Sequence, residues 1–310
     1  MQNTIKQAVS FAGVGLHSGA HATVTVMPAS AETGIWFRRV DVTDRDPLVP
    51  ARWDAVEPSP LCTRIVNTSG VSVSTVEHLM AALAGTGIHN AIIEIDGPEV
   101  PILDGSSAPF VTALVARGVR RLAAPLNAIE ILRPCEVTLG DATARLEPSE
   151  TLEVRFEIDF EDAAIGHQER ELRMANGAFV HELCDARTFC RLADVTQMRA
   201  NGLALGGKAG ENAVVFNGSD IICPGGLRHS DEPVRHKMLD ALGDLALARM
   251  PILGRYTGIR AGHAVTNALL RQVMARPNLY RVVEVDDELA ARLPGSGVSY
   301  FDVAGLIRAA

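Results

Sequence analysis

The sequence has few features that would cross-link a fold through cysteines or anchor it in a membrane. Its 5 cysteines are an odd number and include no CxxC pair, which argues against both a disulfide framework and a cysteine zinc site. No apolar stretch approaches the roughly 20 residues of a membrane-spanning helix. We therefore expect a protein of the reducing cytoplasm without a transmembrane segment.

Basic and aromatic residues are also scarce. The chain has 29 Lys and Arg against 37 Asp and Glu, a formal net charge of −8, which argues against a domain that grips nucleic-acid phosphates. Aromatic residues make up only 5% of the chain, so the core must be mainly aliphatic. With 310 residues, of which 47% are hydrophobic, the chain can bury a sizeable core, which excludes a disordered protein.

The pattern of apolar residues predicts two successive halves that each combine strands and helices. The expected strands cover residues 22–27, 34–40, 63–67, 89–95, 143–146, 152–160 and 256–261, and the expected helices cover 75–84, 107–116, 232–249 and 266–275. Residues 118–127 show no clean periodicity and form the natural joint. We expect an α+β protein with one domain at 1–123, a second at 128–287 that carries an insertion near 188–210, and a C-terminal tail at 288–310.

One predicted helix carries a histidine and two carboxylates along a single face. His236, Asp240 and Asp244 follow one another at i, i+4 steps, which places them one above the other. An imidazole and a carboxylate one turn apart can close on one metal ion. The same spacing is also typical of a solvated helix face with a His–Asp pair, so the spacing alone leaves both interpretations open.

A second helix begins near Ser74. Ser74 and Glu77 have the spacing of a capping box, which predicts that the Glu77 carboxylate bonds back to the Ser74 amide. This interpretation leaves His78 unexplained, because the apolar stripe of the helix turns His78 to the other side. A histidine near a helix N-terminus is kept neutral by the helix dipole, and the neutral form is the one that binds metals.

These residues have the composition of a catalytic zinc site, which uses three His or Asp ligands and keeps a fourth position open. The candidate ligands are His78, His236 and Asp240. Hydrolysis at such a site needs a base and an acid. Glu77 is the candidate base, and His263, just before the last predicted helix, is the candidate acid, with Asp244 able to orient it. We expect one Zn²⁺ per chain, and Fe²⁺ fits the same ligands because His/Asp sets are weakly selective.

Seven segments in chain order resemble one protein family. They are GVGLHSG at 13–19, LCT at 61–63, STVEHL at 74–79, PILDGSSAPF at 101–110, ARTF at 186–189, VRHKMLDALGD at 234–244 and GH at 262–263. The chain resembles the zinc-dependent UDP-3-O-acyl-N-acetylglucosamine deacetylases of Gram-negative lipid A synthesis, from about residue 3 to about residue 285.

The resemblance implies a fold and a reaction. The fold would be two similar α+β domains whose sheets sandwich a layer of helices, with the metal between the domains and a β-α-β insertion in the second domain. The reaction would remove the N-acetyl group from UDP-3-O-(3-hydroxyacyl)-N-acetylglucosamine and release acetate, the committed step of lipid A biosynthesis. The substrate is thus a UDP-sugar with one acyl chain, and we expect a monomer that works close to the membrane surface without entering it.

The resemblance also implies roles for single residues. His78, His236 and Asp240 would hold zinc, Glu77 would be the general base that activates the zinc-bound water, and His263, supported by Asp244, would protonate the leaving amine. The implied substrate contacts are Thr188 on the developing oxyanion, Lys237 on polar groups, Phe160 on the uracil ring, Phe189 beside the sugar, and Leu192, Val195 and Met198 along the acyl chain. From composition alone, those three apolar residues would more simply belong to the core.

One departure from the family pattern concerns the diphosphate. Some relatives carry a lysine where this chain has Ala142, so the contact is lost or moves to Arg260, Arg145 or Lys237. Two other functions stay open. The chain could be a related zinc amidase that acts on another acylated amino sugar, or a non-catalytic ligand-binding homologue. The second is disfavoured because a degenerate copy would be expected to lose one of the catalytic residues.

Overall fold

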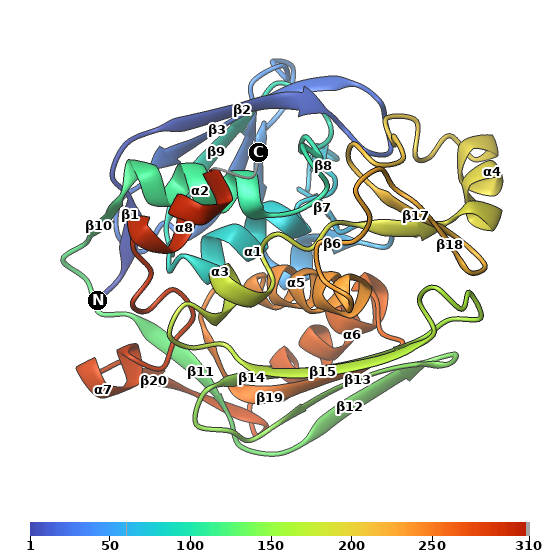
Figure 1. Ribbon diagram of the computed structural model, residues 1–310. Helices are drawn as coiled ribbons and strands as arrows, with labels where there is room; N and C mark the ends of the chain where they lie inside the picture. The colour runs from blue at the N-terminus through green and yellow to red at the C-terminus, as the bar shows by residue number, and fades with distance from the viewer. Residues whose placement is uncertain (60, 308–310) are drawn as a thin grey trace.

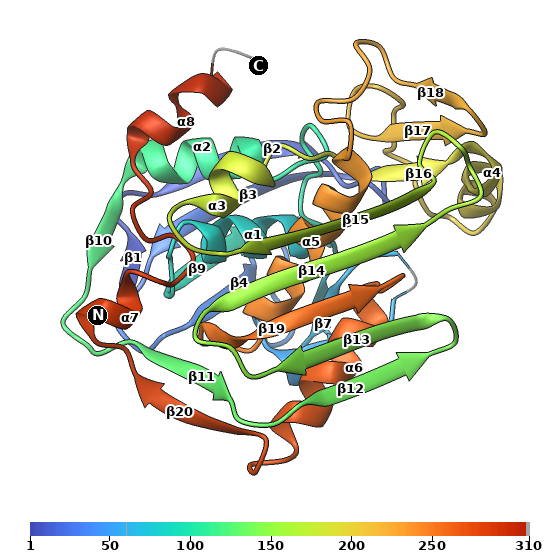
Figure 2. The same ribbon diagram turned by 60° about the horizontal axis from the view of Figure 1, so that its bottom comes forward.

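Two β-sheets face each other across a layer of helices in the computed structural model, which describes residues 1–59 and 61–307 (Figure 1). The first part of the chain builds one sheet and the second part builds the other. Turning the molecule brings the second sheet forward, with α5 (Glu232–Ala246) and α6 (His263–Met274) behind it (Figure 2). This arrangement confirms the predicted α+β architecture with helices between two sheets.

The first sheet has the strand order β2-β3-β9-β4-β5. In β3, Val24 and Val26 are fully buried while Thr23 lies on the exposed face, which is the period of two of a strand that covers a core with one face. Helices α1 and α2 pack together, and α2 also packs on β2. The bounds are β2 (Val9–Val14), β3 (His21–Pro28), β9 (Ala91–Ile95), β4 (Ile35–Arg39), β5 (Leu48–Pro50), α1 (Glu77–Gly85) and α2 (Ala108–Arg117).

Short elements complete this half. Strand β1 pairs with β10, and β6, β7 and β8 form a small antiparallel sheet that follows a 3-10 turn at Trp53–Ala55. The bounds are β1 (Asn3–Ile5), β10 (Val119–Arg121), β6 (Val56–Glu57), β7 (Arg64–Val66) and β8 (Ser72–Val73). The chain passes from the first half to the second between β10 and β11 (Asn127–Ile131).

The second sheet has seven strands, and β19 lies at its centre. Strand β19 runs parallel to β11 and β14 and antiparallel to β13. Strand β20 extends the sheet beyond β11, β12 beyond β13, and β15 beyond β14. The bounds are β12 (Cys135–Leu139), β13 (Ala142–Glu147), β14 (Leu152–Asp159), β15 (His167–Arg173), β19 (Ile252–Ile259) and β20 (Tyr280–Glu284).

The insertion of the second half stands apart from both sheets, at the right of Figure 1. Strands β16 (Phe189–Arg191) and β17 (Val214–Asn217) are parallel and flank α4 (Leu192–Ala200) in the chain, so they form the expected β-α-β unit. Strand β18 (Asp220–Ile222) adds an antiparallel third strand. None of the residues of α4 is buried, so this helix adds nothing to the core.

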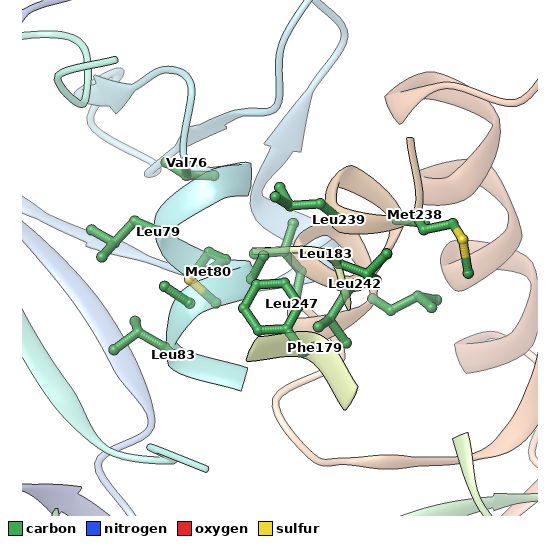
Figure 3. Packing of buried hydrophobic residues seen from close by; sticks show 14 of the residues in the cluster. Val76, Leu79, Met80, Leu83, Phe179, Leu183, Met238, Leu239, Leu242 and Leu247 are labelled. Atoms are coloured by element: carbon green, nitrogen blue, oxygen red, sulfur yellow. The ribbon is translucent and has the colours of Figure 1, made fainter. Parts of the chain in front are cut away.

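Helices α1 and α5 form the contact that joins the two halves. Leu79 and Leu83 point away from α5, whereas Leu239 and Leu242 lie between the two helices (Figure 3). The helices come very close at one point, because a Cβ on Gly243 would lie 2.1 Å from the carbonyl oxygen of Glu77. Only glycine therefore permits this crossing, which also carries the candidate metal ligands described below.

The C-terminal segment returns to the first half. Helix α7 (Asp287–Ala290) follows β20, and α8 (Tyr300–Ile307) packs on α2 and on α3 (Ala178–Glu182). Within residues 1–59 and 61–307, no helix combines the length and apolar character needed to cross a membrane. The cysteines Cys62, Cys135, Cys184, Cys190 and Cys223 are all free thiols.

Candidate active site

The three candidate metal ligands meet between α1 and α5. His78 comes from α1, His236 and Asp240 come from α5, and one ligand atom of each lies within 4.8 Å of the others. Asp240 Oδ1 is 3.5 Å from His78 Nε2 and 3.4 Å from His236 Nε2. All three side chains are buried. The alternative of a solvated helix face is therefore wrong, because α5 lies in the layer between the two sheets.

The donor atoms fit a zinc-like ion. Asp240 Oδ1 is buried and has no hydrogen-bond partner among the described residues, while Oδ2 accepts a hydrogen bond of 2.8 Å from Lys237 Nζ. Nδ1 of His236 lies 3.0 Å from the Ala186 carbonyl oxygen, and a carbonyl only accepts, so Nδ1 carries the hydrogen and Nε2 keeps its lone pair. Burial lowers the pKa of His236 to about 4, which keeps the ring neutral for a metal.

The Glu77 carboxylate faces away from the helix start. Its Oε2 accepts a hydrogen bond of 3.1 Å from the Thr63 amide, and its Oε1 lies 3.6 Å from His263 Nε2. The Ser74 amide instead donates to the Pro98 carbonyl, so the predicted capping box is wrong. Burial raises the pKa of Glu77, although the neighbouring histidines act against this effect, and a raised pKa suits a general base.

The half-buried His263 and the buried Asp244 form a dyad beside Glu77. His263, the first residue of α6, places Nδ1 at 2.8 Å from Asp244 Oδ2. Burial by itself lowers the pKa of His263, but the charges of Asp244 and Glu77 outweigh this effect and raise the pKa to about 9. The imidazole therefore holds a proton at neutral pH, with Nε2 directed toward Glu77. This is the protonation state that a general acid requires.

A cavity of about 700 Å³ opens beside these groups, within the size range of small-molecule sites. Its lining brings together most of the predicted contact residues, namely Thr188, Phe189, Phe160, Lys237, Leu192, Val195 and Met198. The rings of Phe160 and Phe189 meet edge to face with centroids 5.7 Å apart. Because the residues of α4 line this cavity and none is buried, the interpretation of its apolar residues as core is wrong.

Two of the three predicted phosphate cations lie away from the cavity. Arg260 is not among the residues that line the described part of the cavity, and its guanidinium is 2.6 Å from Asp159 Oδ2. Arg145 pairs with Glu147 and Glu136 on the second sheet. Only Lys237 of the three lines the cavity, where it contacts Asp240.

His17 was not among the predicted site residues, and the structure places it in the cavity lining. Its ring is buried, and both ring nitrogens lack a hydrogen-bond partner in the described part of the chain. Glu99 fixes the backbone of the loop that carries His17, since its carboxylate accepts hydrogen bonds from the His17 and Ser18 amides and from Thr75 Oγ1. A buried polar ring without a partner points into a binding site. In the sequence, the GVGLHSG segment was the feature that could have drawn attention to His17.

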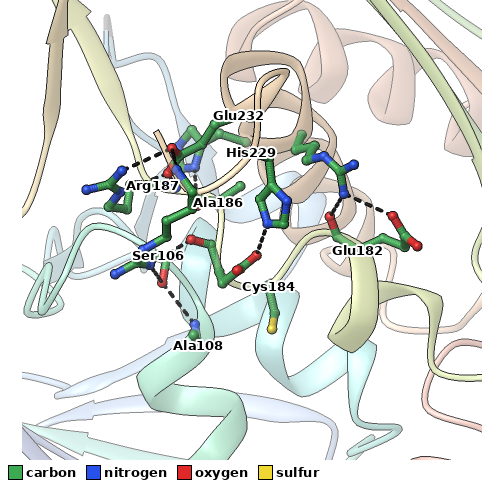
Figure 4. A network of polar contacts seen from close by, with 12 residues as sticks. Ser106, Ala108, Glu182, Cys184, Ala186, Arg187, His229 and Glu232 are labelled. Atoms are coloured by element: carbon green, nitrogen blue, oxygen red, sulfur yellow. Dashed lines mark hydrogen bonds and ion pairs between the residues drawn. The ribbon is translucent and has the colours of Figure 1, made fainter. Parts of the chain in front are cut away.

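A polar network behind the metal ligands was missed altogether. Glu232 at the start of α5 accepts hydrogen bonds from the Arg187 guanidinium and from the amides of Arg187 and Arg228. Figure 4 shows this pair next to Ala186, whose carbonyl faces His236. Both charges are buried, and breaking such a pair costs about 3–5 kcal/mol. The pair thus fixes the segment that carries Ala186 and Thr188 against α5.

Comparisons with known proteins show which family the chain belongs to. A family model described as UDP-3-O-acyl N-acetylglycosamine deacetylase matches residues 2–275. The chain belongs to this family. A UDP-3-O-acyl-N-acetylglucosamine deacetylase of Phenylobacterium zucineum (strain HLK1) is 50% identical over 289 residues, which cover 93% of this chain and 98% of the relative.

A second relative of the same name, from Shewanella sp. (strain ANA-3), is 43% identical over 305 residues, or 96% of this chain and 98% of the relative. A third, from Shewanella baltica (strain OS155 / ATCC BAA-1091), is 42% identical over 303 residues, with the same two coverages of 96% and 98%. The deacetylase family resemblance seen in the seven segments is thereby confirmed over nearly the whole chain.

Proposed function

We propose that this chain removes the N-acetyl group from a UDP-3-O-acyl-N-acetylglucosamine and releases acetate, the committed step of lipid A biosynthesis. The observation that carries the proposal is the convergence of Glu77 Oε1 and His263 Nε2, 3.6 Å apart, beside the three candidate metal ligands. A base and an acid on one side of a Lewis-acid site are what amide hydrolysis needs. The names of the relatives supply the substrate.

His78, His236 and Asp240 would hold one Zn²⁺ per chain. The unpartnered Asp240 Oδ1 and the two imidazole nitrogens are donors that zinc prefers, and Fe²⁺ would accept the same set. When bound, the ion supplies Lewis acidity that polarises the amide carbonyl and makes a water molecule acidic enough to give up a proton to a base as it attacks. The fit of the donors supports this assignment, and the family resemblance favours zinc.

The remaining steps belong to the protein's own residues. Glu77 takes a proton from the attacking water at Oε1, since Oε2 is held by the Thr63 amide. The carbonyl oxygen gains negative charge as the new C–O bond forms, and the Thr188 side chain donates a hydrogen bond to it. His263 then gives its Nε2 proton to the nitrogen as the C–N bond breaks, so that acetate and a free amine leave. Asp244 keeps His263 oriented and charged.

The cavity accounts for the rest of the substrate. Phe160 would stack on the uracil ring and Phe189 would lie beside the sugar, while the acyl chain would extend along α4 over Leu192, Val195 and Met198. Lys237 would meet polar groups of the substrate. Arg260 remains the proposed diphosphate contact, and it would have to leave Asp159 to reach the substrate.

Two substrates and one variant test the proposal. The purified protein should release acetate from the 3-O-acylated substrate and much more slowly from the same UDP-sugar without the acyl chain. His263→Ala should lower turnover by about 10²-fold or more at unchanged metal content. His167→Ala, which changes an exposed histidine on β15, is the matched control and should keep the wild-type rate.

Each alternative has its own outcome. Equal rates on both substrates would favour a zinc amidase of another acylated amino sugar. Substrate binding without acetate release, at a normal metal content, would favour a non-catalytic homologue. The monomeric state, the cytoplasmic location and the closeness to a membrane stay predictions.

A further inference from the structure

Thr63 touches both carboxylates that flank the candidate acid and base. Its amide donates to Glu77 Oε2 at 3.1 Å, and its hydroxyl donates to Asp244 Oδ1 at 2.5 Å. Its carbonyl accepts a hydrogen bond from the Val76 amide at the start of α1. Thr63 lies just before β7, whereas Asp244 lies 181 residues further along the chain on α5. One residue therefore ties the first half to the second at the reacting groups.

We propose that Thr63 is a positioning residue that decides which oxygen of each carboxylate takes part in the reaction. With Oε2 of Glu77 held, Oε1 is the oxygen left facing His263 Nε2. With Oδ1 of Asp244 held, Oδ2 is the oxygen left for His263 Nδ1, at 2.8 Å. The inference rests on the proposed deacetylase function and assigns the Thr63 hydroxyl a place in it.

Burial makes these contacts hard to replace. The exposed fractions of Thr63, Glu77 and Asp244 are each 3%, so bulk water has little access to replace the two hydrogen bonds that Thr63 donates. A threonine hydroxyl has a single hydrogen, and because a carboxylate only accepts, that hydrogen points at Asp244. A buried carboxylate that loses a donor is destabilised, and it turns toward other groups. The Asp244–His263 pair would then no longer hold Nε2 in line with Glu77.

The test removes the hydroxyl and keeps the shape. Thr63→Val retains the amide that binds Glu77 and loses only the donor to Asp244. It should lower kcat by roughly 10- to 100-fold, because a misplacement of about 1 Å near the reacting atoms costs this much. KM should stay within about threefold, since an interaction made only in the transition state changes kcat rather than KM. The metal content should not change.

Two further variants separate the hydroxyl from general damage. Thr63→Ser restores the hydroxyl and should recover most of the lost kcat. Thr151→Val removes another buried threonine hydroxyl, which donates to the Arg292 carbonyl at 2.7 Å outside the cavity lining. It should lower the melting temperature without lowering kcat. Thr63→Ala repeats the experiment if the valine variant does not fold.

A double variant tests the route. Because the hydroxyl acts through Asp244, Thr63→Val should add little to the loss already caused by Asp244→Ala, which removes the side chain that the hydroxyl holds. Wild-type kcat in Thr63→Val, a serine variant as slow as the valine variant, or additive losses in the double variant would each overturn the inference. A wild-type protein that releases no acetate would overturn the proposed function as well, so the two failures can be told apart.

Discussion

The substitution Asp244→Asn removes the negative charge of the Asp244–His263 pair and keeps the geometry of the pair. Asp244 Oδ2 lies 2.8 Å from His263 Nδ1, and Oδ1 accepts from the Thr63 hydroxyl. Asparagine has nearly the same shape: its amide oxygen still accepts from Nδ1, and its amide group donates to the threonine oxygen. The substitution therefore keeps the contacts and removes one negative charge beside His263.

The size of the effect follows from the raised pKa of His263, which is about 9. An opposite charge at this distance raises a pKa by roughly 1–3 units, so the variant should lower the pKa of His263 by about 2 units, to about 7. At pH 8.5 the protonated fraction then falls from about three quarters to about 3%, and the rate falls about 25-fold. At pH 6 the ring is protonated in both proteins, and the rates should nearly agree.

The assay is the initial rate of acetate release between about pH 5.5 and pH 10 at low substrate concentration, where kcat/KM reports the free enzyme. The wild-type profile should be bell-shaped, with the acidic limb set by Glu77 and the metal site and the basic limb by the His263–Asp244 pair. In the variant the basic limb should move to lower pH. An equal loss of rate at every pH, or a basic limb that does not move, would refute the charge-based reasoning.

Three other predictions concern packing, substrate length and stability. Gly243→Ala puts a Cβ 2.1 Å from the Glu77 carbonyl oxygen, so it should lower the free energy of unfolding by about 1–3 kcal/mol and reduce metal content, as measured by denaturant unfolding and metal analysis. Met198→Trp narrows the cavity along α4 and should lower kcat/KM by about tenfold or more for a long acyl chain, since each methylene left exposed costs about 0.8 kcal/mol, but little for a short one. The pKa of His263 is raised above its ordinary value of 6.5, so its contribution to stability is complete below pH 6.5 and is lost as the pH rises toward about 9. Melting temperatures measured across that range should therefore fall more in the wild type than in Asp244→Asn.

Local spacing predicted two of the three candidate metal ligands, because one helix turn separates them. The i, i+4 step from His236 to Asp240 holds in α5, and His78 was added because it lies near the start of a helix more than 150 residues away. Spacing could not decide between a solvated face and a ligand set, since that depends on the layer in which α5 lies. Whether α5 lies between the two sheets depends on the strand order of the whole fold. No local pattern in β19 indicates that this strand pairs with three others.

The capping-box interpretation of Glu77 was wrong for the same reason. The capping-box spacing is a local pattern, whereas the Glu77 carboxylate meets Thr63, 14 residues earlier, and His263 from the last helix of the helical layer. The buried pair of Arg187 and Glu232 escaped notice for a related reason. An arginine in a loop and a glutamate at a helix start are both common in exposed positions. Only the structure shows that these two residues form a buried ion pair.

The central claim is that three ligands hold a metal ion on which the Glu77–His263 pair depends. The most direct measurement is acetate release by protein stripped of metal with a chelator and then supplied with increasing Zn²⁺. Activity should be lost on stripping and should return in proportion to bound zinc, reaching its maximum at about one ion per chain. Asp240→Ala, treated in the same way, should bind little zinc and stay inactive. Full activity in metal-free protein would contradict the claim.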